Sequence, residues 1–572
     1  MDKKEVSAVL NHIGLILELR GENPFKIKAY YNGARIVELL EDDIEKLVEE
    51  ERLGEKKGIG KALQEKITEL VTTGELEYYE TLKDEIPEGL FEILKIPGLG
   101  PKKVKQLYDQ LQITTLGELE YACLENRLID LKGFDLKTQN KILKGIENLK
   151  KYRGKYLISD ALHLALPLVE KLQADPRVIR CSLAGSIRRK KEMIKDIDIL
   201  ASAKKNDRKA IMDHFIAFDE IENVTSQGET KLSVRLISGV NVDLRIVENA
   251  QYPYALHHFT GSKEHNTAMR HRAKEMGLKM NEYGLFTENG EILSCKDEEE
   301  LFHWLKLQYI PPELRENNGE IEAAENHGIP RLVEEKDIQG VFHVHTSYSD
   351  GVNTIEEMTI AASKKGYKFI GISDHSQSAF YAHGLKIEDI WKQHEGIDKL
   401  NEVQNDIYVF KGIESDILIN GCLDYEECIL DKFDYVIASV HNNFNMTKEE
   451  MTHRLIKAVE NKHTKILGHP SGRLLLSREE YPIDIKSVLK ACKFNDVAVE
   501  INANPHRLDL DWRFCKIAKE MGVKIAIEPD AHKIKGLGDV YYGVGIARKG
   551  WLEPQNIINT FTLEQIKAFF KK

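Results

Sequence analysis

From residue 340 onward the chain alternates between short apolar runs and amphipathic stretches, and this pattern limits the fold more than any other feature. Seven apolar runs follow one another: GVFHVH, KFIGISDH, IYVFKGIES, YVIASVH, KILGHP, VAVEINAN and KIAIEPDAH. Strands that alternate with helices form parallel sheets, so seven units within about 235 residues predict a closed or nearly closed β/α barrel. The carboxyl ends of its strands would meet on one face, where barrel enzymes place their chemistry.

Side chains that can bind a metal ion stand at the ends of nearly all these runs. Two histidines one residue apart on a strand share a face, but such a pair often occurs by chance. Here further candidate ligands at the ends of the other runs favour a metal site. The nine candidates are His343, His345, Asp350, His375, Glu414, His441, His469, Asp530 and His532. Nine ligands exceed the needs of one ion, so two or three ions are expected, with Glu414 suited to bridging. Mixed nitrogen and oxygen ligation suits Zn, Mn or Fe.

A glycine-turn motif recurs in the first 150 residues, which otherwise consist of short amphipathic helices. Its copies are KKGIGKALQEKI, IPGLGPKKVKQL and the weaker LKGFDLKTQNKIL. Such a turn exposes backbone N–H groups at the start of a helix and can bind a DNA phosphate without reading sequence. One copy alone would be an ordinary turn, but the repetition favours nucleic-acid binding. The candidate DNA-binding residues are Gly58, Gly60, Gly98, Gly100, Lys102 and Lys103.

The stretch LAGSIRRKKEMIKDIDIL places a phosphate-binding turn ahead of paired carboxylates. Alternating hydrophobicity from Val178 to Phe259 predicts antiparallel strands with one exposed face. Asp196 and Asp198 would lie on the same face of a strand, and Asp243 on another strand could complete the cluster. Three carboxylates of this kind can hold the divalent cations that phosphoryl transfer to a hydroxyl requires. The GS turn followed by DxD resembles the nucleotidyltransferase signature.

The following segment, HHFTGSKEHNTAMRHRA, resembles the nucleotide-pocket motif of family X DNA polymerases. The resemblance implies that Asp196 and Asp198 bind the catalytic Mg²⁺ or Mn²⁺ ions and that Asp243 helps to activate the primer 3′-hydroxyl. His258 and Lys263 differ from the tyrosine and aspartate usual in vertebrate members, which leaves sugar discrimination open. The implied nucleotide-binding residues are Gly185, Ser186, Arg189, His258, Phe259, Gly261, Asn266 and Arg270.

The N-terminal helices resemble that family's small domain for gap and 5′-phosphate binding. Lys26, Tyr30 and Lys66 stand at matching places. By this resemblance Lys66 could form a Schiff base with an abasic sugar as a lyase nucleophile. A solvated helix lysine is an equally good interpretation from the sequence.

The barrel segment resembles the PHP (polymerase and histidinol phosphatase) metallohydrolases, which are distorted seven-stranded barrels with a trinuclear metal site. The resemblance implies two or three Mn²⁺, Zn²⁺ or Fe²⁺ ions and the hydrolysis of a phosphodiester. The implied ligand groups are His343, His345, Glu414 and Asp530; Asp350, His375 and His532; and Glu414, His441 and His469.

The order of the segments is similar to that of bacterial and archaeal family X DNA polymerases. The expected fold is multidomain: α-helical helix-hairpin-helix N-terminal domains, an α+β nucleotidyltransferase palm and thumb, and a distorted (β/α)7 PHP barrel. The expected domains are a small lyase-like domain (1–80), a helix-hairpin-helix domain (81–155), a palm (156–258), a thumb (259–315), an acidic linker (316–336) and the PHP barrel (337–572).

This resemblance implies a DNA polymerase that fills short gaps in base excision repair, with a metal-dependent 3′–5′ exonuclease in the barrel and abasic-site processing as a further activity. Its partners would be gapped or primer-template DNA and dNTPs. Two alternatives stay open for the barrel: a phosphatase for small phosphoesters, or an inactive support for the polymerase. A third alternative is a repair scaffold in which both sites are silent.

Composition and the N-terminal sequence indicate the cellular location of the protein. Seven cysteines without a CxxC pair argue against a disulfide framework, and no apolar run approaches the length of a membrane span. The N-terminus MDKKEVSAVL lacks a secretory pattern, so we expect a cytoplasmic monomer that does not bind membranes. The net charge of −12 means that any DNA contact must come from local basic patches.

Overall fold

The computed structural model describes residues 1–38, 40, 43–56, 58–129, 131–150 and 154–571. The chain forms two compact units. The helical unit comprises Met1–Leu124 and Leu128–Leu149, and the large unit comprises Glu125–Arg127 and Lys150–Lys572. Among the described residues, no helix combines the length and the apolar character needed to cross a membrane.

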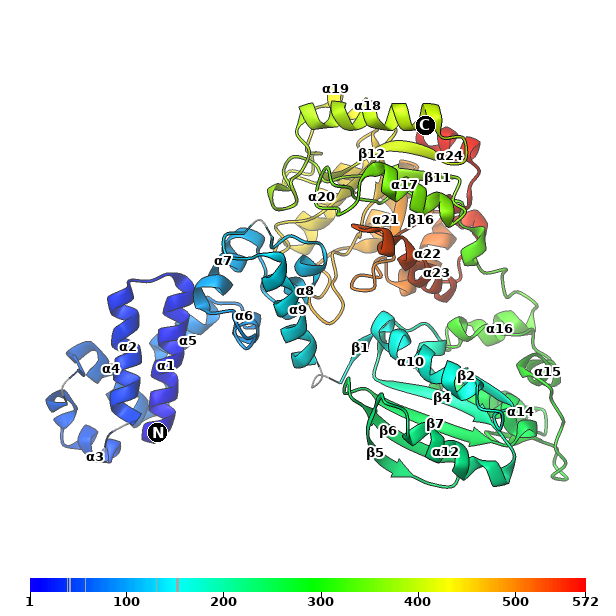
Figure 1. Ribbon diagram of the computed structural model, residues 1–572, viewed down its shortest axis with the longest axis horizontal. Helices are drawn as coiled ribbons and strands as arrows, with labels where there is room; N and C mark the ends of the chain where they lie inside the picture. The colour runs from blue at the N-terminus through cyan, green and yellow to red at the C-terminus, as the bar shows by residue number, and fades with distance from the viewer. Residues whose placement is uncertain (39, 41–42, 57, 130, 151–153, 572) are drawn as a thin grey trace. The chain divides into compact units, whose positions relative to one another are not determined.

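The helical unit packs its helices around a shared apolar core that includes Ile13, Leu17, Ile67 and Val104 (Figure 1). Glycine turns precede two of its helices as predicted: Gly60 caps α4, and Gly100 caps α7 with a proline directly after it. The helices are α1 (Lys3–Arg20), α2 (Pro24–Glu38), α3 (Ile44–Glu49), α4 (Lys61–Thr73), α5 (Glu77–Asp84), α6 (Gly89–Ile93), α7 (Pro101–Leu111), α8 (Leu116–Leu124) and α9 (Leu136–Lys150).

The large unit begins with a five-stranded sheet whose order is β2-β4-β7-β6-β5. Alternate residues of its strands are buried, because one face packs on the helices and the other carries polar side chains. The strands are β2 (Arg180–Leu183), β4 (Asp196–Ser202), β5 (Ile221–Gln227), β6 (Lys231–Leu236) and β7 (Asn241–Val247), with helices α10 (Ile158–Gln173), α11 (Gly185–Arg188) and α12 (Arg208–Ile216). Short strands β1 (Tyr156–Leu157) and β3 (Met193–Ile194) pair separately.

The prediction of a purely antiparallel sheet is wrong at its centre. Strands β4 and β7 run parallel, and their register sets Asp198 opposite Asp243. Alternating hydrophobicity gives the same signal for either direction of pairing, so only the connection between the strands decides it.

A smaller layer follows the sheet and continues through the segment predicted as a linker. That segment is packed: Glu320 and Ala324 are fully buried, and Glu320 accepts a hydrogen bond from His265 Nδ1 at 2.7 Å. Polar anchors of this kind leave no apolar periodicity to detect. The elements are α13 (Tyr252–Thr260), α14 (Lys263–Glu275), β8 (Lys279–Asn281), β9 (Gly284–Phe286), α15 (Glu298–Trp304) and α16 (Glu320–Glu325).

The C-terminal part is the predicted parallel barrel. All seven apolar runs form neighbouring strands in chain order, and Val344 bridges to Ala531, which joins the first strand to the last. The strands are β10 (Gly340–Val341), β11 (Phe369–Ile372), β12 (Tyr408–Asp416), β13 (Tyr435–Ser439), β14 (Thr464–Leu467), β15 (Ala498–Asn502) and β16 (Ile525–Glu528). The first strand is shorter than expected, so His343 and His345 lie just beyond it.

Helices surround these strands (Figure 1). They are α17 (Ile355–Lys364), α18 (Ile387–Val403), α19 (Glu427–Leu430), α20 (Lys448–Val459), α21 (Ile485–Phe494), α22 (Trp512–Met521), α23 (Val540–Lys549) and α24 (Leu563–Lys571).

An aromatic cluster closes the barrel at the amino ends of its strands. Phe369 and Tyr435 are the first residues of β11 and β13, and the Phe342 ring lies 5.1 and 5.5 Å from their ring centroids. Phe570 of α24 lies 5.0 Å from the Phe342 ring. Apolar packing fills this end, so the polar side chains collect at the opposite one.

We expect Phe342→Ala to lower the free energy of unfolding of the barrel by about 3–5 kcal/mol, because it empties a fully buried aromatic position. The measurement is the midpoint of urea unfolding. Phe494→Ala is the matched control: that side chain is 89% exposed, so its change should stay within about 0.5 kcal/mol. Equal effects of the two substitutions would contradict the role of the cluster.

Candidate active sites

A cavity of about 420 Å³ opens between the five-stranded sheet and helices α13 and α14. All eight residues that the sequence predicted to bind nucleotide line it, together with Asp196 and Asp198. Lys195 and Ser262 line it as well and were missed, although each adjoins a predicted residue. The complete lining is Gly185, Ser186, Arg189, Lys195, Asp196, Asp198, His258, Phe259, Gly261, Ser262, Lys263, Asn266 and Arg270.

Three carboxylates converge beside this cavity. Burial, with added repulsion from Asp243 and Asp196, raises the pKa of Asp198 to about 6. Asp243 is held by Lys231 Nζ, 2.7 Å from its Oδ2, and by Ser233 Oγ, which donates to its Oδ1 at 2.5 Å. Several carboxylates close together favour the binding of divalent cations.

The turn before α11 requires glycine. Gly185 has a φ of +60°, and a Cβ there would lie 2.0 Å from Asp198 Oδ2. The close approach brings the backbone of the turn against the carboxylate, so the turn predicted to bind phosphate and the strand predicted to bind metal form one surface.

Helix termini position the opposite wall. Ser262 caps α14 by accepting a hydrogen bond from the backbone N–H of His265 at 3.2 Å. Asn266 Nδ2 donates to the backbone carbonyl of His258 at 2.7 Å, and the Arg245 guanidinium lies 4.2 Å from the centroid of the Phe259 ring. The start of α14 and the end of α13 are thereby held together at the cavity.

At the mouth of the barrel, five histidines surround the carboxylate of Glu414. The shortest distances from its oxygens to ring nitrogens are 2.9 Å for His375, 3.0 Å for His469, 3.2 Å for His441, 3.3 Å for His343 and 3.7 Å for His345. All six side chains are at most 5% exposed.

The remaining predicted ligands adjoin this cluster. Asp530 Oδ1 lies 3.2 Å from His345 Nε2, and Asp350 Oδ1 lies 3.3 Å from His532 Nε2. Four groups could each hold an ion: His345, Asp350, His375 and His532; His343, His345 and Asp530; His375, Glu414 and His441; and Glu125, Asp530 and His532. His345, His375, Asp530 and His532 thus belong to two groups each, a sharing that the sequence could not show.

Two buried carboxylates that the sequence reasoning missed orient the histidines. Glu500 Oε1 lies 2.6 Å from His343 Nδ1, and Asp416 Oδ1 lies 2.5 Å from His441 Nδ1. Such contacts select the ring nitrogen that faces a metal. Both acids lie on buried strands, Asp416 on β12 and Glu500 on β15.

The donor set fits metal ions. Within the part of the chain that the structure describes, His343 Nε2, His345 Nε2 and His532 Nε2 are buried and make no hydrogen bond. Buried polar atoms without partners are rare, and imidazole nitrogens that converge with carboxylates are the usual ligands of Zn, Mn and Fe.

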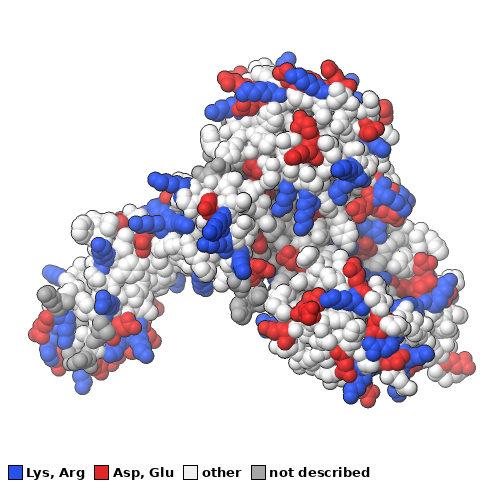
Figure 2. All heavy atoms as spheres, in the orientation of Figure 1, with Lys and Arg blue, Asp and Glu red and all other residues white. Residues whose placement is uncertain are grey.

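The glycine turns of the helical unit are open to solvent. Gly58 and Gly98 have φ of +104° and +93°, and a Cβ at Gly60, Gly98 or Gly100 would meet nothing within 4 Å. The exposed backbone can therefore be approached by a phosphate. Over the barrel, acidic and basic side chains are interspersed on the face shown in Figure 2.

Near the start of the chain, Lys66, Lys26 and Tyr30 gather around the ring of Tyr78. Lys66 Nζ lies 4.8 Å and Lys26 Nζ 5.9 Å from its centroid, and the Tyr30 ring stacks at 6.3 Å. The three predicted residues therefore share one surface, and Tyr78 was missed because it belongs to a later helix, α5.

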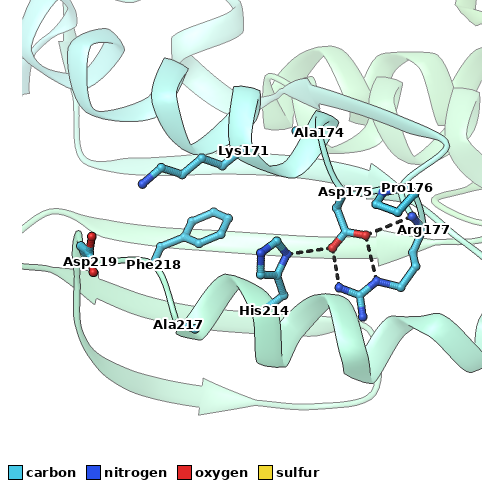
Figure 3. Close-up of a pocket in the computed structure, with 9 residues that line it drawn as sticks. All are labelled: Lys171, Ala174, Asp175, Pro176, Arg177, His214, Ala217, Phe218 and Asp219. Atoms are coloured by element: carbon cyan, nitrogen blue, oxygen red, sulfur yellow. Dashed lines mark hydrogen bonds and ion pairs between the residues drawn. The ribbon is translucent and has the colours of Figure 1, made fainter.

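A larger depression of about 560 Å³ lies elsewhere on the large unit, between α10 and α12 (Figure 3). One of its carboxylates is already paired: Asp175 with Arg177 Nη2 at 2.6 Å and with His214 Nδ1 at 2.8 Å. We assign it no chemistry, because no cluster of catalytic side chains faces it.

Known protein families match four parts of the chain. The helix-hairpin-helix domain matches residues 1–76 and the SAM-like helix-hairpin-helix tandem residues 91–148. The DNA polymerase beta thumb matches residues 255–316, and the PHP domain residues 342–504.

Among curated proteins, the DNA polymerase/3′-5′ exonuclease PolX of Bacillus subtilis (strain 168) is 39% identical over 576 residues and covers all of both chains. A probable phosphatase of Thermoanaerobacter sp. (strain X514) is 30% identical over 247 residues, 40% of this chain and 93% of its own. A probable phosphatase of Caldicellulosiruptor bescii is 31% identical over 244 residues, 40% of this chain and 94% of its own. The match to the Bacillus protein runs through both active-site regions and all the domains, so the chain belongs to the PolX family of DNA polymerases and 3′-5′ exonucleases.

Proposed function

We propose that this protein fills short gaps in DNA at the palm cavity and degrades unsuitable 3′ ends at the barrel mouth. The observation that carries the proposal is that one chain, colinear with a PolX protein, has both a cavity lined by Asp196 and Asp198 and a cluster of imidazoles and carboxylates that could hold metal ions. These two activities would serve base excision repair.

At the palm, Asp196 and Asp198 would hold two Mg²⁺ or Mn²⁺ ions, which neutralise the triphosphate and lower the pKa of the attacking hydroxyl when bound. Asp243 accepts the proton of the primer 3′-hydroxyl. Ser186 and Arg189 hold the triphosphate oxygens. The remaining lining residues orient the nucleotide: Gly185, His258, Phe259, Gly261, Asn266 and Arg270.

At the barrel, nine residues would hold two or three Mn²⁺, Zn²⁺ or Fe²⁺ ions, which supply hydroxide near neutral pH and stabilise the leaving oxygen when bound. Those residues are His343, His345, Asp350, His375, Glu414, His441, His469, Asp530 and His532. Glu500 and Asp416 keep the rings of His343 and His441 in place.

The substrates are gapped or primer-template DNA and dNTPs. The turns at Gly58, Gly60, Gly98 and Gly100 bind phosphates of the DNA backbone, and Lys102 and Lys103 add charge. We expect a monomer in the cytoplasm.

A second function for the barrel is hydrolysis of a small phosphoester. It is favoured by relatives that match about 40% of the chain and are named as probable phosphatases, among them those of Thermoanaerobacter and Caldicellulosiruptor. Fusion to a DNA-binding polymerase favours a DNA end as the substrate.

The two sites can be separated by substitution. On labelled gapped DNA with Mn²⁺, Asp243→Ala should slow extension by about 10²–10⁴-fold, because it removes the proton acceptor, and should leave 3′ degradation unchanged. His343→Ala should slow degradation by at least about 10²-fold, because it removes a ligand, and should leave extension unchanged.

Each variant is the other's control. If His343→Ala degrades DNA as fast as the parent, the barrel is not the nuclease. If the parent hydrolyses p-nitrophenyl phosphate through His343 but leaves DNA ends intact, the phosphatase function is correct. A parent without either activity on DNA would favour a scaffold.

Asp198 predicts a pH-dependent stability in the absence of metal. Because its pKa rises from 3.8 to about 6 on folding, the protein loses stability as pH rises through that interval. With EDTA, Asp198→Asn should therefore gain about 2 kcal/mol over the parent between pH 4.5 and 7.5. The measurement is urea unfolding.

Mg²⁺ provides the control for this prediction. At pH 7.5 it should stabilise the parent more than Asp198→Asn, since the ions bind the ionised carboxylate. A difference between the two proteins that does not change with pH would contradict the assignment.

We propose in addition that Lys66 acts as a lyase nucleophile. Its amine would add to the aldehyde carbon of a 5′ abasic sugar and release water, forming a Schiff base. Borohydride should trap a covalent adduct with the parent, and Lys66→Ala should reduce trapping by at least about tenfold. Lys46→Ala, an exposed lysine of the same unit, is the control. Undiminished trapping by Lys66→Ala would exclude this role.

A further inference from the structure

A buried lysine of the barrel reaches the polymerase region of the large unit. Lys549 is the last residue of α23 and is 1% exposed. Its Nζ donates to Glu316 Oε1 at 2.5 Å and to the backbone carbonyl of Arg189 at 3.2 Å. The ammonium also lies 4.7 Å from the centroid of the Trp512 ring. A lysine side chain is rarely fully buried unless it is paired with an acidic group.

Glu316 connects this lysine to the nucleotide cavity. The same oxygen that accepts from Lys549 also accepts from Arg189 Nε at 3.1 Å. Arg189 Nη1 donates to the backbone carbonyl of Thr260, and a Cβ at Gly261 would lie 3.2 Å from it. The guanidinium is therefore held on three sides, and it lines the cavity beside Asp196 and Asp198.

Lys549 and Arg189 each carry a positive charge, and both contact the single carboxylate of Glu316. Glu192 adds a further negative charge near Lys549. Although burial alone would raise it, the pKa of Glu316 is lowered overall by Lys549 and Arg189. Without Lys549, Glu316 would pair with Arg189 alone and would compete with a bound phosphate for its donors.

Neighbouring contacts between the barrel and the polymerase region do not reach the cavity in this way. Arg548 Nε donates to Glu313 Oε1 at 2.7 Å, and Arg473 Nη2 lies 3.6 Å from Glu192 Oε1. Arg473 also pairs with Asp511 at 2.5 Å, and neither Glu313 nor Glu192 lines the cavity.

We propose that Lys549 is a positioning residue of the polymerase: it draws the charge of Glu316 away from Arg189 and so keeps that guanidinium available to the triphosphate of the incoming nucleotide. This inference rests on the proposed polymerase function. It makes the barrel a working part of the nucleotide site as well as a separate catalytic domain.

The test is single-nucleotide gap filling by the full chain, with KM for the dNTP and kcat measured separately. Lys549→Met should raise KM about tenfold, because a charge-assisted contact to the triphosphate is weakened, and should change kcat less. Lys549→Arg should stay within about threefold of the parent, since the cation is kept. Degradation of 3′ ends at the barrel reports whether each variant is folded.

The double variant Glu316→Gln/Lys549→Met separates positioning from packing. Removal of the competing carboxylate should return KM to within about threefold of the parent, whereas lost packing would make the double variant worse than Lys549→Met. Arg548→Met is the matched control, because it breaks the neighbouring contact to Glu313 and should change KM by less than about twofold.

The outcomes are distinct. An unchanged KM for Lys549→Met, an equal rise for Arg548→Met, or a double variant worse than the single one would each overturn the inference. If Lys549→Met fails to fold, Lys549→Gln replaces it in the same comparisons. A parent that extends no primer would refute the proposed function instead.

Discussion

The carboxylate of Glu414 is the centre on which the barrel mouth depends. Five imidazoles approach it, from segments that lie far apart in the chain. A buried carboxylate and several buried imidazoles are costly without compensation, which cations bound between them would provide. The closed barrel makes this arrangement possible, because parallel strands bring all their carboxyl ends to one face while the aromatic cluster around Phe342 fills the other.

The palm also brings several carboxylates close together, but with fewer residues than the barrel. Parallel pairing of β4 and β7 sets Asp198 opposite Asp243, and Gly185 allows a backbone turn to approach the same carboxylate. Lys231 and Ser233 offset part of the charge at Asp243, whereas Asp198 retains a raised pKa. The nucleotide site is thus preorganised for cations on one side and for phosphate on the other.

The two sites belong to one compact unit, and ion pairs connect the barrel to the polymerase region. The barrel contributes cations, Arg473, Arg548 and Lys549, and the polymerase region contributes the acids they meet. Only Lys549 shares its carboxylate with a residue of the nucleotide cavity. A domain that is separable by sequence therefore contributes to the electrostatics of its neighbour.

Short-range patterns identified most of the parts. The seven apolar runs specified the strand order of the barrel, and the glycine turns marked the starts of α4 and α7, because period and turn chemistry are local properties. The eight residues predicted to bind nucleotide all line one cavity, since they came from two compact motifs joined by a family resemblance. The packed segment around Glu320 was mistaken for a linker because its anchors are polar.

The features that the sequence did not predict involve residues that lie far apart in the chain. Tyr78, Glu500, Asp416 and Lys549 carry no local signal that names their partners. By itself, the sequence determined the seven-stranded barrel, the nine candidate ligands at its mouth and the candidate aspartates of the palm. Only the tertiary structure decided the parallel pairing of Asp198 with Asp243, the sharing of His345 and His375 between ligand groups, and the contact of Lys549 with the polymerase site. Those features depend on long-range packing, which leaves no periodic trace in the chain.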